Sequence, residues 1–426
     1  LTADFAQNFA NYYYLGRLVT ITYAILTLPL IYQIGQKWFR QSTGFIAIWL
    51  FMFYPNFIYH ARMVRTDSAT LFYIMLSLWL ILRLYDENRL GNHLLVGLAI
   101  GFSISTKYIL AALIPVYLLV CLIHVWQDRS ITRLRSETVN AAAGLAMVLL
   151  GFAVSTPYFF LDFNTALDNL RAEARSEHLG ADGLSKGGNL WYYLTSALPR
   201  IMTWPQLLLG LAAMGVSLWQ RRLAHIVLIS FACIYLIGAS LSPLHWLRWA
   251  FPVVPVLTLF SAEGIWSVSR FVAHSVFRRW QGHRYLLASF VLLLAASPFY
   301  ETILLDIQQA NPSTRILARE WLVENVPSGS KIGQEWYTAP LEGTSFEVIN
   351  MWALGQDRVL ADYYEEGFDY LVASSGMYNR FYADPERSPT QVQFYDSLSE
   401  TDVLVQEINP STTRNGPTIK IYKLFR

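Results

Sequence analysis

The sequence predicts a polytopic α-helical membrane protein that ends in an α/β domain. Its 426 residues are 54% hydrophobic and only 15% charged, whereas a soluble domain carries about a quarter charged residues. The apolar residues come in long blocks, which are typical of membrane-spanning helices. After residue 304 the composition changes, and charged residues alternate with short apolar runs.

Ten apolar segments predict about ten spans within a transmembrane domain of residues 1–304. The fourth and fifth segments are separated only by "STKY", so we expect two short helices that meet near one face of the membrane. The segments are 13–36, 43–60, 67–85, 93–107, 108–126, 138–160, 203–219, 223–242, 248–270 and 285–303.

The short connections between these segments predict the orientation of the chain. Five of them are rich in Lys and Arg, and in a ten-span protein all five fall on one side, which the positive-inside rule makes cytoplasmic. We therefore expect an integral membrane protein with these five connections in the cytoplasm. The basic connections are 37–42, 83–93, 127–137, 220–222 and 270–284. The predicted outer face holds 61–66, Lys107, the outer loop 161–202, 243–247 and the domain 305–426.

Residues 305–426 are predicted to form an extracytoplasmic soluble α/β domain. A helix is expected to open at Pro312 and Ser313. The segments "FDYLVASS", "DVLVQEI" and "TIKIYKLF" have the apolar alternation of strands. At roughly 120 residues the domain is large enough for a core of its own.

The predicted outer loop 161–202 contains an amphipathic stretch followed by the Gly-rich "LGADGLSKGGN". We expect a helix on the membrane surface and then a mobile segment that covers a cavity. Trp191, Tyr192 and Tyr193 suit the aromatic belt at the membrane interface.

The sequence has few markers of soluble enzyme chemistry. Cys121 and Cys233 both fall inside apolar segments, so we expect packing residues rather than a disulfide or a metal pair. It contains no CxxC, HExxH, Walker or GxGxxG pattern, so neither nucleotide chemistry nor nucleic-acid binding is expected. Metal dependence stays open, and a divalent cation at the site is one alternative.

The stretch "HARMVRTDSAT" at 60–70 places charged groups between two apolar blocks. Arg62 and Arg65 fall on the predicted outer face, where the positive-inside rule disfavours Arg. Lys107 and Arg248 reach the same leaflet. Ionisable groups at membrane depth are costly and indicate a functional site, although each cation could instead extend to lipid headgroups.

Together these cations suit an anionic headgroup, such as a phosphate whose hydrophobic tail stays in the bilayer. Asp67 fits beside a phosphate if it pairs with Arg65, holds a divalent cation or accepts a proton from an acceptor hydroxyl. Its structural alternative is the N-cap of the helix 68–85. We expect Asp67, Lys107 and Arg248 to face one cavity at membrane level.

Several segments resemble the GT-C superfamily of polyprenyl-phosphate-sugar-dependent glycosyltransferases, in the branch of the protein O-mannosyltransferases and aminoarabinose transferases. Three of them are "YYYLGRLVTITYAILTLPLIYQIGQKWF", "YPNFIYHARMVRTDSATLFYIMLSLWLIL" and "GLAIGFSISTKYILAALIP". "LRAEARSEHLG" and "WYYLTSALP" are similar to the branch's large outer loop. "HWLRWAFPVVPVL" is similar to its R-Y-x-x-P-x-x-P segment, with Trp249 in place of the usual Tyr. The resemblance covers about residues 12–300. The tail resembles the outer soluble domain that some bacterial members carry, which implies a protein of the bacterial inner membrane with an extracytoplasmic C-terminal domain.

The resemblance implies an enzyme that moves a sugar, with inversion, from a polyprenyl phosphate to a protein, lipid or glycan acceptor at the outer face. It implies that Lys107 and Arg248 hold the carrier phosphate and that Asp67, with Arg62 and Arg65, forms a second charged motif in which Asp67 is catalytic. Candidate acceptor or loop contacts are His60, Tyr108, Glu173, His178 and His245.

One feature departs from the family pattern. The family's general base usually lies in an Asp-Glu pair of the first outer loop, whereas here Asp4 is the sole acid before "YYLGR". Either the family's first span and loop lie upstream, as we expect, or the base is lost.

Two other functions stay open: a degenerate subunit that scaffolds a larger membrane complex, and a transporter of a lipid-linked anion. A transporter should show repeated halves, and only one broken hairpin, at Lys107, is evident.

Overall fold

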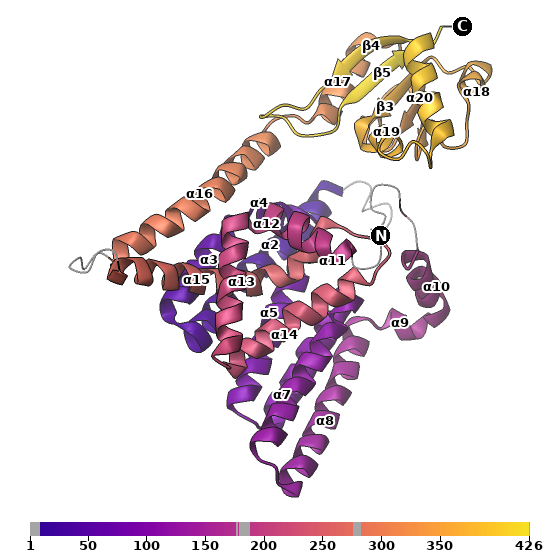
Figure 1. Cartoon of the computed structure of the whole chain (residues 1–426). Coiled ribbons are helices and arrows are strands. Elements are labelled where there is room, and N and C mark those ends of the chain that lie inside the picture. The colour runs from indigo at the N-terminus through magenta and orange to yellow at the C-terminus, as the bar shows by residue number, and fades with distance from the viewer. Residues whose placement is uncertain (1–8, 176–177, 179–187, 276–282, 426) are drawn as a thin grey trace. The chain divides into compact units, whose positions relative to one another are not determined.

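The computed structural model describes residues 9–175, 178, 188–275 and 283–425. The chain divides into two compact units, Leu1–Thr302 and Ile303–Arg426, which we call the membrane unit and the C-terminal unit (Figure 1).

The membrane unit is entirely helical in its described residues. Its first half consists of α2 (Phe9–Ile34), the π-helical turn η1 (Gly35–Phe39), α3 (Gln41–Met52), α4 (Pro55–Arg62), α5 (Asp67–Asp86), α6 (Leu90–Thr106), the 3-10 turn η2 (Tyr108–Ala112), α7 (Leu113–Gln127) and α8 (Ile131–Ser155). Its second half consists of α9 (Tyr158–Leu161), α10 (Phe163–Glu173), α11 (Gly188–Tyr192), η3 (Tyr193–Ala197), α12 (Leu198–Met202), α13 (Trp204–Trp219), α14 (Leu223–Ser240), η4 (Leu247–Val253) and α15 (Val254–Ser275). The helix α16 (His283–Ala310) begins in this unit and ends in the next.

The predicted polytopic fold is confirmed. Within the described residues, seven helices are long and apolar enough to cross a membrane, or up to nine if each of two bent pairs counts as one span. The bent pairs are α3 with α4, at 65°, and Gly188–Met202 with α13, at 116°. The shorter apolar helix α6 has 17 residues. Each of the ten predicted apolar segments therefore coincides with a helix, a helix pair or part of one.

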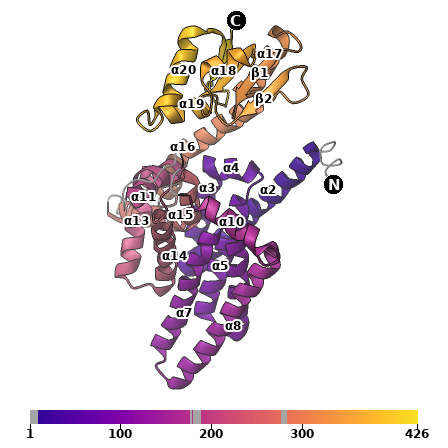
Figure 2. The same ribbon diagram turned by 90° about the vertical axis from the view of Figure 1, so that its right-hand side faces the viewer.

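Small residues allow α6 and α8 to pack closely. A Cβ atom on Gly97 would lie 2.0 Å from the carbonyl oxygen of Gly144, and one on Gly101 would lie 2.4 Å from that of Val148. Glycines spaced four residues apart let membrane helices approach backbone to backbone. Both views show α8 alongside α7 as well (Figures 1 and 2). These contacts hold the α6–α7 hairpin, and with it Lys107, in a fixed place.

Four of the five basic connections meet at one end of the helix bundle. The side of the membrane that this end faces stays a prediction. The contacts that join the connections are Lys37 Nζ to Asp86 Oδ2 at 2.8 Å, Asn88 Nδ2 to Glu137 Oε1 at 2.6 Å, Arg40 Nη2 to Glu263 Oε1 at 2.6 Å, and Arg222 Nη1 to the same Glu263 oxygen at 4.0 Å.

The predicted outer loop 161–202 is helical at both ends. The exposed helix α10 matches the expected amphipathic stretch. Residues 188–202 pack into the membrane unit instead of forming a loop, because their apolar side chains contact the core. Tyr193 is fully buried there, so its assignment to the aromatic belt is wrong, whereas Trp191 is 67% exposed. Nearly all of the Gly-rich stretch, 179–187, lies outside the described residues.

The two cysteines are both free thiols, but they differ in burial. Cys121 is buried within α7, as expected. Cys233 is exposed on α14, on the same side as the exposed Ile237 and Leu241. The expectation of a core packing role is therefore wrong for Cys233, since this apolar face of α14 is not covered by protein.

The C-terminal unit is an α/β domain, as predicted. It contains α17 (Thr314–Asn325), β1 (Lys331–Glu335), β2 (Glu347–Met351), α18 (Leu360–Glu365), β3 (Tyr370–Ser374), α19 (Ser375–Tyr382), α20 (Pro389–Thr401), β4 (Val403–Ile408) and β5 (Ile419–Lys423). Ser313 is the N-cap of α17, which confirms the predicted start of that helix.

One five-stranded sheet, in the order β2-β1-β3-β5-β4, forms the centre of the C-terminal unit. The strand β1 is parallel to β2 and β3, and β5 is antiparallel to β3 and β4. The helix α17 covers one face, where Leu322 packs with Ile332 and Val372. On the opposite face the hydroxyl group of Tyr422 of β5 lies 3.2 Å from that of Ser399 of α20. The three strands predicted from sequence motifs correspond to β3, β4 and β5.

Candidate active site

The carboxylate of Asp67 lies at the first residue of α5, and its side chain is buried. Asp67 is 4% exposed, and a carboxylate in the first turn of a helix is favoured by the helix dipole. The N-cap of α5 is Thr66, and no side chain makes a capping hydrogen bond there. The N-cap role considered for Asp67 is therefore wrong, since its carboxylate points to other partners.

Lys107 is the principal partner of Asp67. It follows the last residue of α6 with an extended backbone (φ −155°, ψ 123°), and η2 begins at the next residue. Its Nζ donates a hydrogen bond to Oδ1 of Asp67 at 2.5 Å. The broken hairpin predicted at "STKY" is thus present. The Lys107 side chain is 21% exposed and that of Asp67 is 5% exposed, so the ammonium is accessible to a ligand while the carboxylate is enclosed.

His60 links this ion pair to a third segment of the chain. Its Nδ1 lies 3.4 Å from Oδ2 of Asp67, and its ring centroid lies 5.4 Å from that of Phe251. Phe251 belongs to η4, which packs against the start of α5. The corner between α4 and α5, predicted as part of the site, therefore contacts the segment that carries Arg248.

Arg248 lies in η4, half-buried, with its guanidinium carbon 5.5 Å from the centroid of the Trp246 ring. Among the described residues it makes no ion pair with Asp67. The structure thus brings Asp67, Lys107 and His60 into contact and places η4 next to them. One cavity shared by Asp67, Lys107 and Arg248 stays a prediction.

The expected pairing of Arg65 with Asp67 is wrong. Residues 63–66 form the turn between α4 and α5, and Arg65 is exposed within it. Asp67 lies inward on α5, where Lys107 and His60 occupy its two oxygens. Arg62 is half-buried in the last turn of α4.

The outer loop contacts both segments that carry the predicted phosphate ligands. Tyr108, directly after Lys107, and Glu173 of α10 line one cleft of about 380 Å³. The His178 ring lies 5.0 Å from the Trp246 ring, and the His245 ring lies 4.1 Å from that of Tyr192. The candidate loop contacts therefore fall into two groups, one beside Lys107 and one beside Arg248.

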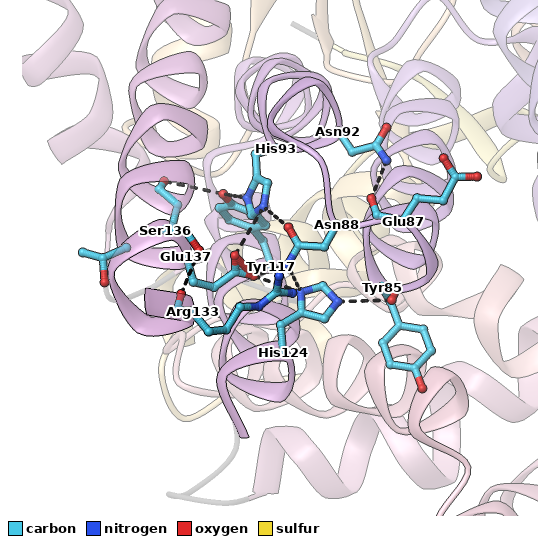
Figure 3. A network of polar contacts seen from close by, with 12 residues as sticks. Tyr85, Glu87, Asn88, Asn92, His93, Tyr117, His124, Arg133, Ser136 and Glu137 are labelled. Atoms are coloured by element: carbon cyan, nitrogen blue, oxygen red, sulfur yellow. Dashed lines mark hydrogen bonds and ion pairs between the residues drawn. The ribbon is translucent and has the colours of Figure 1, made fainter. Parts of the chain in front are cut away.

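Sequence analysis missed a buried polar network at the other end of α5 (Figure 3). Glu137, 2% exposed, accepts a hydrogen bond from Asn88 Nδ2 at 2.6 Å and lies 2.9 Å from His124 Nδ1. His93 Nδ1 lies 2.8 Å from the Tyr117 hydroxyl, and its Nε2 lies 3.1 Å from Asn88 Oδ1. The network joins the connection after α5 to α6, α7 and α8.

This network is separate from the Asp67 site. The 20 residues of α5 lie between them, which corresponds to about 30 Å of helix. Asn88 and Glu137 come from two of the basic connections, whereas His93, Tyr117 and His124 come from apolar segments. Each was visible in the sequence as a single polar residue, but nothing in the spacing joined them. In the described part of the chain, no group of three His, Cys, Asp or Glu residues is placed to hold a metal ion.

The family match lies within the membrane unit. A family model described as dolichyl-phosphate-mannose-protein mannosyltransferase matches residues 3–167, a range that includes Asp67 and Lys107 but not Arg248. No curated protein matches the chain.

Two solved structures are similar to the chain over most of its length. ArnT from Cupriavidus metallidurans bound to undecaprenyl phosphate has a TM-score of 0.51 at 12% identity, with 95% of this chain and 83% of that chain covered. The apo oligosaccharyltransferase of Archaeoglobus fulgidus has a TM-score of 0.47 at 13% identity; the match covers 88% of this chain but only 61% of that chain's length. The chain therefore shares the fold of ArnT, and its first 167 residues include the region that matches the mannosyltransferase family model.

Proposed function

We propose that the chain is a membrane glycosyltransferase, which moves a sugar from a polyprenyl phosphate to an acceptor at the outer face of the membrane, with inversion at the anomeric carbon. The observation that carries this proposal is the Lys107–Asp67 ion pair at the break of a membrane hairpin, within the region that the family model matches. The undecaprenyl phosphate named for ArnT supports this class of donor.

The charges of the site suit a carrier phosphate. Without a donor, Asp67 neutralises Lys107. The Lys107 ammonium has three donor hydrogens, so it can bind a phosphate oxygen and keep Asp67 as a partner. Arg248 offers a planar guanidinium that can bind two phosphate oxygens, and Arg62 lies in the same corner as His60. A bound phosphate would place negative charge between Lys107 and Arg248.

Asp67 has a positioning role in this proposal. Lys107 holds one of its oxygens and His60 lies beside the other, so neither oxygen is placed to take a proton from an acceptor. Asp67 instead fixes the Lys107 ammonium at the hairpin break and keeps it charged. His60, between Asp67 and Phe251, holds the carboxylate against the η4 segment. The direct catalytic role expected for Asp67 stays a prediction beside this positioning role.

The reaction requires little covalent chemistry from the protein. The acceptor nucleophile attacks the anomeric carbon, the bond from that carbon to the phosphate oxygen breaks, and the phosphate leaves with the electron pair. A single displacement inverts the configuration. Lys107 and Arg248 stabilise the charge that develops on the leaving phosphate. The acceptor's proton passes to a base that we do not assign among the described residues.

The test uses the full chain in lipid nanodiscs with undecaprenyl phosphate carrying mannose, glucose or aminoarabinose, and a membrane extract as the source of acceptors. We expect free undecaprenyl phosphate to be released from one of these donors. Lys107→Met should slow release by about a hundredfold, the size expected for losing one group that stabilises transition-state charge. Lys37→Met is the matched control, because Lys37 pairs with Asp86 at the opposite end of the bundle.

The scaffold alternative predicts a different outcome. A wild-type chain that binds the carrier but releases none of it would contradict the enzymatic proposal and favour a degenerate subunit. Equal loss of release in Lys37→Met and Lys107→Met would also contradict it, because the loss would then follow from disrupting either ion pair and would not be specific to the Lys107 site.

A further inference from the structure

The C-terminal unit contains a cleft where the parallel strands β1 and β2 end. Its volume is about 400 Å³, within the range of small-molecule sites. In sheets with parallel strands, ligands bind in the crevice beyond the carboxyl ends of the strands. The side chains that matter for its chemistry are Arg315, Gln334, Trp336, Tyr337, Glu342 and Asn350.

The polar side chains of the cleft are held in place by hydrogen bonds to neighbouring groups. They also keep N–H donors that no protein group in the described part of the chain uses. Gln334, 4% exposed, donates from Nε2 to Asn350 Oδ1 at 2.7 Å. Arg315 donates from Nε to the carbonyl oxygen of Thr338 at 2.6 Å. Among the described residues, no partner takes up the two terminal nitrogens of Arg315 or the amide nitrogen of Asn350. These groups are therefore oriented donors at the edge of the cleft.

Two aromatic residues follow β1 and form another wall. Trp336 is 56% exposed, an unusual position for so large an apolar ring. Tyr337 has φ 66°, a conformation that is strained for a non-glycine residue and often accompanies a functional site. Its ring is held by Arg380, whose Nη2 donates to the tyrosine hydroxyl at 3.4 Å. A Cβ atom on Gly376 would lie 3.1 Å from that ring.

The charge of the cleft argues for an uncharged ligand. Arg315 and Glu342 carry opposite charges. The third ionisable residue of the lining, Glu335, is buried, and its carboxylate accepts hydrogen bonds from Tyr395 and from the Ser374 and Leu354 amides. The groups left for a ligand therefore favour neither a strong anion nor a strong cation. An exposed indole suits the C–H face of a ring, and planar amide and guanidinium groups suit pairs of hydroxyls. A polyhydroxylated ring with one apolar face combines these requirements.

We propose that this cleft binds a carbohydrate, with one sugar ring stacked on Trp336 and its hydroxyls bonded by Arg315 and Asn350. The site is separate from the membrane unit's reaction and does not depend on it. It would give the C-terminal unit a glycan-recognition role, whatever sugar the membrane unit handles.

Saturation-transfer-difference NMR on the full chain in nanodiscs tests the proposal. The probes are the methyl glycosides of mannose, glucose, galactose and N-acetylglucosamine. We expect saturation transfer to at least one glycoside, weakened by about tenfold in Trp336→Ala, as expected for loss of one aromatic contact, and reduced in Arg315→Ala. Trp336→Phe should retain part of the signal, because it keeps an aromatic face.

Two control variants make the result specific. Trp352→Ala removes a second exposed tryptophan, which lies just after β2 but does not line the cleft, and it should keep the signal. Asp67→Asn should also keep the saturation-transfer signal, because Asp67 lies in the membrane unit. Only a glycoside bound in the membrane unit would lose signal in that variant. No transfer in the wild type, an unchanged signal in Trp336→Ala, an equal loss in Trp352→Ala, or displacement of the glycoside by inorganic phosphate would overturn the proposal.

Discussion

Lys107 and Asp67 lie 40 positions apart in the sequence, yet Nζ of one is 2.5 Å from Oδ1 of the other. They meet because α5 and α6 are antiparallel neighbours. Asp67, the first residue of α5, therefore lies beside Lys107, which follows the last residue of α6. This geometry accounts for the charge in the 60–70 stretch. Asp67 and His60 face inward to hold a cation at membrane level, whereas Arg65 points outward.

The first prediction concerns the stability of this pair. Lys107→Met leaves the Asp67 carboxylate buried with only His60 beside it, and breaking a buried ion pair costs about 3–5 kcal/mol. We expect a clearly lower Tm in detergent. The double variant Asp67→Asn/Lys107→Met should melt closer to the wild type than Lys107→Met alone, because it removes the unpaired charge. Additive losses in the double variant would show that the two side chains are not coupled.

The second prediction separates Arg248 from Arg65. If Arg248 binds the carrier phosphate, Arg248→Ala should lower kcat/KM for the undecaprenyl-phosphate-linked donor by about tenfold or more, as expected for a lost hydrogen bond to a charged group. Arg65→Ala should change it little, because Arg65 is exposed and does not pair with Asp67. The measurement is the rate of carrier release at several donor concentrations. A larger effect at Arg65 than at Arg248 would reverse the assignment.

The third prediction concerns the network around Glu137. Glu137→Ala removes the acceptor shared by Asn88 and His124, so we expect a loss of about 3 kcal/mol or more, typical of an uncompensated buried polar group. Glu87→Ala is the control, because Glu87 is 42% exposed. Carrier binding should be unchanged in both variants, since α5 separates the network from Asp67. Loss of carrier binding in a folded Glu137→Ala chain would show that the two sites are linked.

The fourth prediction is a pH dependence in the C-terminal unit. Burial raises the pKa of Glu335 from 4.5 to about 7, although hydrogen bonds from Tyr395 and from the Ser374 and Leu354 amides act in the opposite direction. The folded state therefore keeps a proton that the unfolded state loses above pH 4.5. The stabilising contribution is fully present below about pH 4.5 and is lost as the pH rises toward 7.

Hydrogen exchange of peptides from β1 and α20, corrected for intrinsic exchange, measures this effect. Protection in the wild type should fall between pH 5 and 7, whereas Glu335→Gln should show a flatter profile. A Glu335→Gln chain with the same pH profile as the wild type would mean that another group titrates in this range.

The sequence predicted those helices and breaks that depend only on residues within one segment. Each of the ten apolar blocks coincides with a helix, a helix pair or part of one, and "STKY" located the hairpin break at Lys107, because a run of that length cannot form one span. The capping residue Ser313 located the start of α17. The identities of the charged residues near Asp67 were also visible, since ionisable groups are rare in membrane segments.

Pairing between distant segments could not be predicted in the same way. Asp67 has Arg65 two positions away, and local reasoning chose that neighbour over Lys107, although the turn at 63–66 directs Arg65 outward. The Glu137 network depends on four segments meeting, which no single segment reveals. Residues 188–202 were assigned to a loop because their helices are short and broken, yet Tyr193 and Leu198 are fully buried.

A cryo-electron microscopy structure of the full chain with undecaprenyl phosphate tests the central claim most directly. The proposal predicts a phosphate oxygen about 2.7–2.9 Å from Lys107 Nζ, the usual length of a charge-assisted hydrogen bond, with Arg248 turned toward the same phosphate and Asp67 still beside Lys107. A phosphate bound elsewhere, with the Lys107–Asp67 pair unchanged and closed to the ligand, would contradict the account.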